Sequence, residues 1–321
     1  MTPSRRKILI GGAGALATLA GGGAALGLIA RDHGLQARTR AGVAFGTTVA
    51  LTFAGPDADV LDAAIERGFA EIRACERAAS LQRPDSALSR LNRDGRLDAP
   101  DPRLLALTRF ALELAEASSG AFDPTVQPYW PLWASAAAHG RRPDDAAREA
   151  AARLVGWRDV EASEEMIAFR RPGMAMTLNG ILQGYAADGV IAAAREIGAP
   201  NSFVDTGEFG AYGASPEGRP WRLGGATAKD EGQMATIADP FTGFAATSAG
   251  AGTPFSRDGA DNHIFDPRTG LSPQRVVAVT AFAPGGMLAD GLSTAAYVLD
   301  EDGASALARK LGGRLSQVTR A

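Results

Sequence analysis

A histidine stands in an unusual setting near the C-terminal end of the chain, which has only three histidines in all. His263 lies between Asp261 and Asp266 in the stretch DNHIFDPRTG, residues 261–270. A carboxylate bonded to one imidazole nitrogen raises the basicity of the other nitrogen. The stretch therefore predicts a proton acceptor near neutral pH. The alternative is an ordinary surface histidine in a turn, because Pro-Arg-Thr-Gly is typical turn sequence.

A carboxylate and two hydroxyls follow shortly afterwards, in ADGLSTAAYVL at 289–299. Asp290 and Thr294 are four residues apart and so share a helix face, with Ser293 beside them. Carboxylate, hydroxyl and carbonyl oxygens are hard ligands that suit Mg²⁺ and suit zinc or copper poorly. A bound Mg²⁺ usually also holds a substrate phosphate. The alternative is that Asp290 simply caps a helix beginning at about residue 289.

A glycine-marked turn lies near the middle of the chain, in TLNGILQGYAAD at 177–188. Gly180 and Gly184 frame a passage from an apolar strand into a helix, where backbone amides can face an anion and carbonyls can face a cation. The spacing matches neither G-x-G-x-x-G nor a P-loop. A tight strand-to-helix junction is the alternative interpretation.

An aromatic loop, SSGAFDPTVQPYWPLW at 118–133, follows a predicted helix end. Such a loop can stack on a flat heteroaromatic ring while Asp123 accepts a hydrogen bond from that ring. The alternative is a hydrophobic loop under a proline-rich crossing. The aromatic residues are Phe122, Tyr129, Trp130 and Trp133.

The elements that must position these residues alternate without a regular βαβ rhythm, which favours an α+β fold. Apolar periodicity predicts helices at 101–117 and 184–197 and strands at 44–54 and 174–178. The segment 82–95 is charged and rich in turn residues.

The composition is that of an ordinary globular protein, with 321 residues, 45% hydrophobic residues and a formal net charge of −3. Nothing in this balance predicts a nucleic-acid partner. The single cysteine excludes an intrachain disulfide and a cysteine-based zinc site.

The first thirty residues predict export. Arg5 and Arg6 stand in a basic start, and residues 8–30 are uncharged. This order resembles a twin-arginine signal, so we expect a periplasmic protein whose only membrane contact is this signal. The alternative is an uncleaved inner-membrane anchor. Residues 31–42 are expected to be a polar linker, and 43–321 the functional domain.

Taken in order, the motifs resemble the ApbE family from about residue 45 to residue 311. The resemblance implies an ApbE-like, T-fold-related α+β fold with mixed or antiparallel sheets, packed helices and two intimately packed lobes. The matching segments are FGTT at 45–48, RPDSALSRLN at 83–92, AFDPTV, GYAAD, VDTGEFGAYG at 204–213, ATSAG, HIFDPRTG and ADGLSTA.

The resemblance also implies a reaction. Members of this family cut FAD between its phosphates and join FMN through a phosphoester to a Thr or Ser of a target flavoprotein, releasing AMP. It implies that Mg²⁺ is held at the FAD diphosphate, and that His263 or Asp290 accepts the proton of the target hydroxyl. The implied metal ligands are Asp290, Thr294, Ser293 and the carbonyl of Gly180. The residues implied to border FAD are Phe45, Ala121, Phe122, Asp123, Thr177, Gln183, His263 and Ile264.

Some positions depart from the family pattern. Thr177, Asn179 and Gln183 replace, in that order, an Asp, a small residue and a Lys or Glu, and Gly207-Glu208-Phe209 replaces Gly-Gly-Asp. The N-G-I-x-Q-G form resembles the NosX-like exported subgroup. These departures keep two alternatives open. One is a non-catalytic FAD-binding carrier or assembly factor for a periplasmic flavoprotein, as in nitrous oxide reduction. The other is a Mg²⁺-dependent FAD pyrophosphatase.

Overall fold

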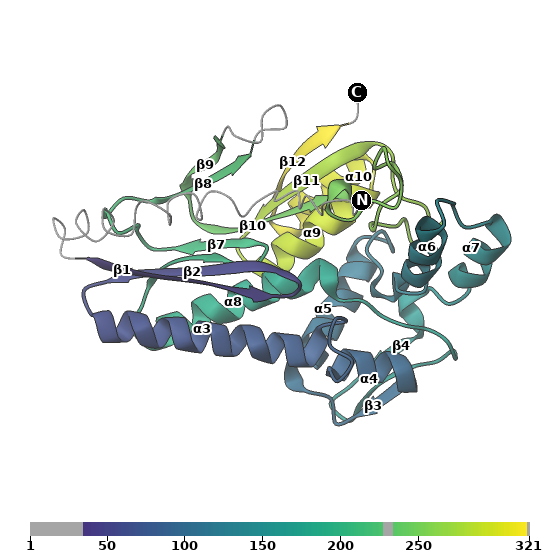
Figure 1. Ribbon diagram of the computed structural model, residues 1–321, viewed down its shortest axis with the longest axis horizontal. Coiled ribbons are helices and arrows are strands. Elements are labelled where there is room, and N and C mark those ends of the chain that lie inside the picture. Colours follow the sequence, from purple (N-terminus) through teal and green to yellow (C-terminus); the bar gives the residue numbers. More distant parts are fainter. Residues whose placement is uncertain (1–34, 227–233, 320–321) are drawn as a thin grey trace, which may run out of the picture.

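A seven-stranded antiparallel sheet forms the centre of the computed structural model, which describes residues 35–226 and 234–319 (Figure 1). Every neighbouring pair of strands in this sheet runs antiparallel. In spatial order the strands are β1 (Gln36–Ala44), β2 (Thr47–Gly55), β6 (Asn201–Asp205), β7 (Phe209–Tyr212), β10 (Gly243–Ala249), β11 (Val276–Ala283) and β12 (Arg314–Thr319).

The first strand corrects the predicted linker at 31–42, because residues 36–42 belong to β1. This strand is an edge of the sheet, and its arginines pair with the neighbouring helix α3 (Ala58–Ala79). Arg38 contacts Asp62 at 3.1 Å, and Arg40 contacts Glu66 at 2.5 Å. Half-exposed edge strands carry polar side chains, which explains the linker-like composition. The predicted export signal at 1–30 lies outside the described residues.

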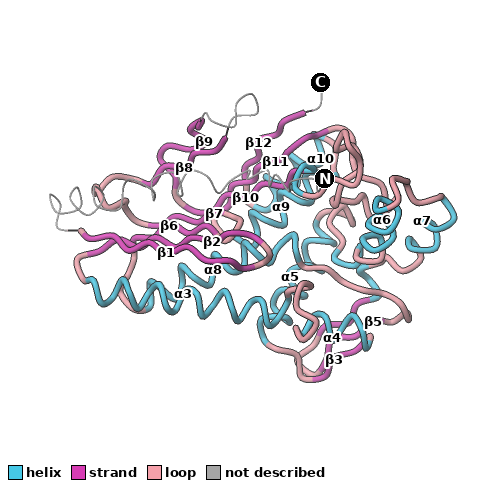
Figure 2. Tube along the Cα trace, viewed as in Figure 1, coloured by secondary structure: helices cyan, strands magenta, loops and turns pink. Residues whose placement is uncertain are grey.

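Helices cover one face of the large sheet. In Figure 2, α3 and α8 (Asn179–Glu196) run along the strands, and α9 (Gly286–Val298) lies beside α8. Alternate strand residues such as Leu51 and Phe53 point to this face and pack against the helices. After α9 the chain continues through α10 (Glu301–Leu311) into β12.

A hairpin covers part of the opposite face. Its strands are β8 (Trp221–Ala226) and β9 (Met234–Phe241). Trp221, Leu223 and Phe241 pack with residues of β7 and β10 that point away from the helices. The sheet is therefore buried on both faces where β7 meets β10.

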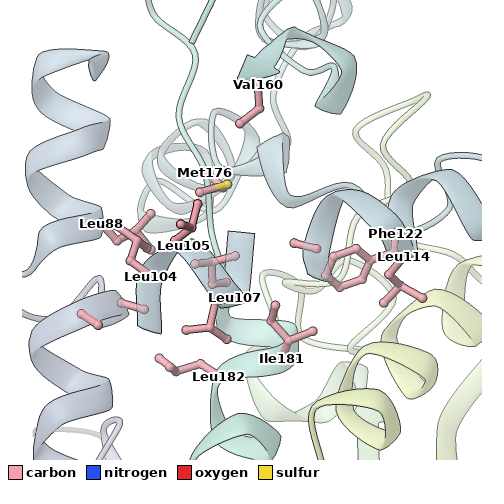
Figure 3. Packing of buried hydrophobic residues seen from close by; sticks show 14 of the residues in the cluster. Leu88, Leu104, Leu105, Leu107, Leu114, Phe122, Val160, Met176, Ile181 and Leu182 are labelled. Atoms are coloured by element: carbon pink, nitrogen blue, oxygen red, sulfur yellow. The ribbon is translucent and has the colours of Figure 1, made fainter. Parts of the chain in front are cut away.

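A smaller unit packs beside the N-terminal end of α8. It contains the three-stranded sheet β3-β5-β4, whose strands are Arg96–Asp98, Met166–Phe169 and Val160–Ala162. Figure 3 shows Leu88 of α4 (Ala87–Asp94) and leucines of α5 (Pro102–Ala117) in one cluster with Ile181 and Leu182 at the start of α8. The helices of this unit are α4, α5, α6 (Tyr129–Ala138) and α7 (Asp145–Ala152), with short 3₁₀ turns at Pro124–Val126 and Trp157–Asp159.

The α+β prediction is confirmed, and several elements match their predicted ranges. Helix α5 begins one residue after the start of the predicted range. Helix α8 begins five residues earlier than predicted. The turn-rich segment 82–95 contains α4, which the charge of the segment concealed. Ser86 caps this helix by accepting from Ser89 N–H at 3.0 Å, and Gly95 ends it with a left-handed φ of 73°.

The predicted strand at 174–178 is an irregular connection instead. The side chain of Asn92 takes the place of a neighbouring strand, because it bonds Met176 in both directions. Asn92 Nδ2 donates to Met176 O at 2.8 Å, and Met176 N donates to Asn92 Oδ1 at 2.8 Å. Met174, Met176 and Leu178 are all buried, which accounts for the apolar pattern of this connection.

In the described ranges 35–226 and 234–319, no helix is both long enough and apolar enough to cross a bilayer.

Helices α8 and α9 cross closely at Gly184 and Gly286. A Cβ atom on Gly184 would overlap the carbonyl of Gly286. Gly184→Ala should therefore lower the free energy of unfolding by about 1–3 kcal/mol or more. Gly189→Ala on the same helix is the matched control, because its Cβ would meet Glu71 only at 3.8 Å.

Urea unfolding of both variants provides the measurement. The control should unfold at the wild-type urea midpoint or above it, because alanine's higher helix propensity adds up to about 1 kcal/mol to the free energy of unfolding. Equal midpoints for the two variants would contradict the close crossing.

Candidate functional site

The crossing of α8 and α9 brings together residues that are more than a hundred positions apart in the sequence. Gly184 N donates to Asp290 Oδ2 at 3.0 Å. One turn earlier on α8, a Cβ placed on Gly180 would lie 3.0 Å from Thr294 Oγ1. The glycine turn and the Asp-Thr pair therefore face each other directly. We call this place the crossing recess, defined by Gly180, Gly184, Asp290, Ser293 and Thr294.

A third segment reaches the same recess. Ser248, near the end of β10, lies with its Oγ 2.8 Å from Ser293 Oγ and 3.1 Å from Thr294 Oγ1. Ser293 Oγ also donates to the carbonyl of Asp290 at 2.9 Å. Sequence reasoning missed Ser248 as a site residue, although the ATSAG motif that contains it had been noticed. The recess is thus lined by hydroxyl, carbonyl and carboxyl oxygens.

Asp290 is buried, and no positively charged residue of the described chain lies beside it. The residue is 4% exposed, and burial raises the pKa of its carboxyl to about 7 while the N–H groups of Gly184 and Gln183 oppose that rise. Burial, together with the charges of Asp290 and Asp205, raises the pKa of Glu208 well above its usual range. Neither carboxyl is stabilised by a lysine or arginine of the described chain. A buried carboxyl in this condition favours a proton or a bound cation.

The helix that carries Asp290 begins earlier than the sequence predicted, so Asp290 is not a cap. Helix α9 starts at Gly286, and Asp188 of the GYAAD motif caps it. The two oxygens of Asp188 accept from Gly286 N at 2.7 Å and from Met287 N at 2.8 Å. The GYAAD motif therefore fixes both the crossing, through Gly184, and the start of α9.

His263 is not oriented by either neighbouring aspartate, which corrects the prediction. Asp261 pairs with Arg142 at 2.6 Å, and Asp266 pairs with Arg268 at 2.6 Å. Burial lowers the pKa of His263, and its Nδ1 atom is buried without a hydrogen-bond partner in the described structure. The imidazole is therefore neutral at neutral pH and keeps an open nitrogen.

The His263 turn is connected to the recess by the short 3₁₀ turn at Gly250–Gly252, which continues directly from β10. A Cβ on Gly252 would lie 3.3 Å from His263 Cε1. His263 N–H donates to the carbonyl of Thr253 at 3.2 Å. The imidazole therefore packs against the segment that begins at Ser248.

The aromatic loop at 118–133 supports this turn through Tyr129 and Trp133, in place of their predicted ring-stacking role, whereas the predicted role of the exposed Trp130 stays a prediction. Tyr129 Oη donates to the carbonyl of Pro267 at 3.1 Å, and Trp133 Nε1 donates to that of Gly270 at 2.8 Å. Both aromatic side chains are fully buried. This outcome agrees with the alternative of a hydrophobic loop, with the added finding that the loop packs under the histidine turn.

Phe122 and its neighbours lie between this loop and α8. A Cβ on Gly180 would lie 3.3 Å from Phe122 Cε2, so the phenyl ring adjoins the crossing recess. Ala121 is buried next to it. Asp123 is buried and accepts from Thr125 N at 2.8 Å, Thr125 Oγ1 at 2.6 Å and Trp157 N at 3.2 Å. Its proposed bond to a flavin stays a prediction.

Two other predicted FAD residues lie on α8 or just before it. Gln183 Nε2 donates to Thr206 O at 2.9 Å, and Thr206 Oγ1 donates to Gln183 O at 2.8 Å. The amide of Gln183 thus fixes the β6–β7 turn against α8. Thr177 N donates to the carbonyl of Pro124 at 2.7 Å, which holds the approach to α8 against the aromatic loop.

Two more residues predicted to border FAD, Phe45 and Ile264, lie farther from the crossing in the sequence. Phe45 stands in the β1–β2 turn with a positive φ of 53°, and its N–H donates to Glu76 Oε1 at 3.0 Å. Ile264 is buried against Tyr297 of α9 and against β11. Their contact with a flavin stays a prediction.

A cleft of about 740 Å³ lies at the other end of β10. Its lining includes Arg195, Tyr212, Gly243 and Arg314. Gly243 is the first residue of β10, whereas Ser248 is the sixth, so the cleft is separate from the crossing recess.

The donor set of the recess fits a hard divalent cation. No group of three His, Cys, Asp or Glu side chains in the described ranges is arranged to hold a metal ion by itself. The recess offers one carboxylate with hydroxyl and carbonyl oxygens, and Mg²⁺ is typically held by one or two carboxylates together with substrate phosphates. The unbalanced negative charge of Asp290 agrees with this fit.

Comparison with known proteins agrees with the fold and the motifs. The chain is 31% identical over 281 residues to a FAD:protein FMN transferase from Treponema pallidum, covering 80% of this chain and 77% of that protein. It is 29% identical over 309 residues to the enzyme of that name from Haemophilus influenzae, covering 89% and 87%. The crystal structure of apo flavinyl transferase ApbE from Pseudomonas stutzeri superposes with a TM-score of 0.75 at 27% identity, covering 89% of this chain and 92% of that one.

The fold and the site define an α+β protein of the flavin transferase class, in which an oxygen-lined recess lies at a glycine helix crossing. The profile of the ApbE family matches residues 45–318, and the chain belongs to this family.

The burial of Asp290 predicts a gain in stability when its charge is removed. The folded-state pKa, about 7, lies above the ordinary value of 3.8. The stability cost is therefore absent below the lower value, grows as pH rises, and is complete above the higher value. In metal-free protein, Asp290→Asn should raise the free energy of unfolding by about 1–4 kcal/mol at pH 8, and by clearly less at pH 5.

Urea unfolding at the two pH values measures this difference. The exposed Asp94→Asn serves as the control, and its effect should be small and nearly the same at both pH values. If Asp290→Asn gives no gain at pH 8, the carboxyl is not buried at an electrostatic cost.

Proposed function

We propose that this chain is a FAD:protein FMN transferase, which moves FMN from FAD to a Thr or Ser hydroxyl of a target flavoprotein and releases AMP. Membership of the ApbE family and the names of its relatives support the flavin transfer. The observation that carries the proposal is the convergence of Asp290 and Thr294 with Gly180 and Gly184 at the helix crossing.

The reaction is a phosphoryl transfer. The hydroxyl oxygen of the target attacks the phosphorus of the FMN half, the bond from this phosphorus to the oxygen bridging the two phosphates breaks, and AMP leaves with that oxygen. The hydroxyl proton must pass to a base. Positioning and charge neutralisation supply most of the rate in reactions of this class.

Four groups would hold Mg²⁺ in the crossing recess: the carboxylate of Asp290, the hydroxyls of Ser293 and Thr294, and the carbonyl of Gly180. When bound, the ion neutralises the negative charge that develops on the phosphates. The chain itself preorganises these oxygens, because Gly184 N–H orients the Asp290 carboxyl and Ser248 bonds both hydroxyls.

His263 is the better supported proton acceptor of the two candidates. Its imidazole is neutral because burial lowers its pKa, and its Nδ1 atom has an open lone pair or proton according to the tautomer. Asp290 already accepts from Gly184 N–H and is assigned to the metal. A neutral imidazole next to the Ser248 segment can take the proton of an entering hydroxyl.

The border of the FAD site is proposed to include Phe45, Ala121, Phe122, Asp123, Thr177, Gln183, His263 and Ile264. The phenyl ring of Phe122 supports this assignment most strongly, because it lies against Gly180 at the edge of the recess.

The place of action is proposed to be the periplasm, on the strength of the twin-arginine-like start of the sequence. The acceptor would then be an exported or membrane-bound flavoprotein with a Thr- or Ser-containing segment. Replacing Arg5 and Arg6 by lysine should retain the protein in the cytoplasm, as measured by cell fractionation. An unchanged periplasmic fraction would contradict twin-arginine export.

The acceptor assay tests the activity. The protein is incubated with FAD, Mg²⁺ and candidate acceptor proteins, and acceptor mass and AMP are followed together. Covalent FMN on the acceptor with matching AMP supports the transferase. AMP alone indicates a pyrophosphatase, and neither product with bound FAD indicates a carrier.

Variants in the same assay test the residue roles. Asp290→Ala and Thr294→Ala should each abolish Mg²⁺-dependent transfer, and His263→Gln should slow it by about 10²–10⁴-fold. Circular dichroism and thermal melting check that each variant stays folded. An undiminished rate in either recess variant refutes the metal assignment, and an undiminished rate in His263→Gln refutes the base assignment.

A further inference from the structure

The large sheet opens between β7 and β10 near the crossing recess. These strands pair from Ala211–Gly243 to Phe209–Ala245 and no further. Continued pairing would place Thr247 opposite Gly207, but the chain turns away there, since Gly207 has a positive φ of 99°. The backbone N–H of Thr247 therefore has no strand partner on this side.

The side chain of Glu208 takes the place of the missing strand. Thr247 N donates to Glu208 Oε2 at 2.9 Å. On its other side, β10 continues to pair with β11, where Thr247 lies opposite Thr280. The end of β10 is thus fixed from one side by backbone pairing and from the other side by one carboxylate.

Ser248 directly follows the residue that Glu208 holds. As described above, its Oγ lies 2.8 Å from Ser293 Oγ and 3.1 Å from Thr294 Oγ1. A change in the path of β10 at Thr247 would move Ser248 and release both hydroxyls. The backbone from Thr247 to Ser248 therefore connects the Glu208 carboxylate to the Ser293 and Thr294 hydroxyls that line the recess.

The backbone of Glu208 is itself fixed against α8. Thr206 N donates to Glu208 O at 3.0 Å, and Gln183 Nε2 donates to Thr206 O at 2.9 Å. Gln183 immediately precedes Gly184, whose N–H orients the Asp290 carboxyl. Glu208 is thus connected by hydrogen bonds to both helices of the crossing.

We propose that Glu208 is a positioning residue, which holds Ser248 and through it the Ser293 and Thr294 hydroxyls in the arrangement that binds the cation. The inference rests on the proposed function of the crossing recess, and it concerns a residue in the Gly-Glu-Phe segment that replaces the usual Gly-Gly-Asp. Residues behind metal ligands typically contribute 10–100-fold to metal affinity or activity.

The test measures cation binding directly, with Mn²⁺ as the probe. Electron paramagnetic resonance gives the apparent Mn²⁺ dissociation constant of the full chain with saturating FAD and no acceptor. Flavin fluorescence gives the FAD affinity without metal. Glu208→Ala should weaken Mn²⁺ binding about 10–100-fold while FAD affinity without metal stays within about twofold.

A conservative variant separates the hydrogen bond from the charge. Glu208→Gln keeps an oxygen that can accept from Thr247 N–H, so its Mn²⁺ affinity should stay close to that of the wild type. Ser248→Ala removes the next link and should reproduce the loss seen with Glu208→Ala. It also carries the test if Glu208→Ala fails to fold.

Two reference variants complete the design. Glu217→Ala is the matched control, because Glu217 also accepts a hydrogen bond, from Ser215 Oγ at 2.7 Å, in the loop after the far end of β7. It should leave Mn²⁺ affinity unchanged. Asp290→Ala should abolish Mn²⁺ binding, and if it does not, the proposed metal site itself fails.

The inference is overturned if Asp290→Ala loses Mn²⁺ while Ser248→Ala and a folded Glu208→Ala bind it within about twofold of the wild type. It is also overturned if Glu208→Gln is as weak as Glu208→Ala, since the charge and not the bond to Thr247 would then be required.

Discussion

The close crossing of α8 and α9 is the constraint on which the site depends. Two helices can approach this closely only where side chains are absent, and here Gly184 and Gly286 meet backbone to backbone. This approach allows Gly184 N–H to reach the Asp290 carboxyl and Gly180 to reach the Thr294 hydroxyl. Larger residues at these positions would separate the helices and the oxygens that they carry.

At this crossing the Asp290 carboxyl is buried, and its charge helps to raise the pKa of the half-buried Glu208, while no lysine or arginine of residues 35–226 and 234–319 stabilises either carboxyl. Such an arrangement lowers the stability of the empty protein. Natural proteins tolerate this kind of cost mainly at functional sites. The unfavourable electrostatics therefore agree with a recess that is built to receive a cation and a phosphorylated substrate.

Much of the fold was predictable where local sequence determines structure. The helix at 101–117 follows from apolar periodicity, the α+β class from the lack of a regular βαβ rhythm, and the shared helix face of Asp290 and Thr294 from their spacing. Local signals failed where distant residues decide. The partner of Asp261 is Arg142, 119 positions away, so the two aspartates beside His263 were wrongly expected to orient it. Residues 36–42 have the composition of a polar linker, and the acidic partners of their arginines lie on α3, outside the local sequence.

Ser248 was missed for a related reason. A serine in a strand carries no local sign of metal chemistry, and its role becomes visible only when β10 is placed beside α9. The family resemblance provided the order of the motifs, but it did not provide the hydrogen bonds from Glu208 to Thr247 or from Gln183 to Thr206. These bonds are made by the side chains of Glu208 and Gln183 with distant backbone groups, so no local pattern indicates them.

Anomalous diffraction from crystals soaked with Mn²⁺ and FAD tests the central claim most directly. The account predicts an anomalous peak within about 2.0–2.3 Å of an Asp290 carboxylate oxygen and of Thr294 Oγ1, with the FAD phosphates next to it. A fully occupied Mn²⁺ peak elsewhere, with both of these oxygens free of metal, would contradict it.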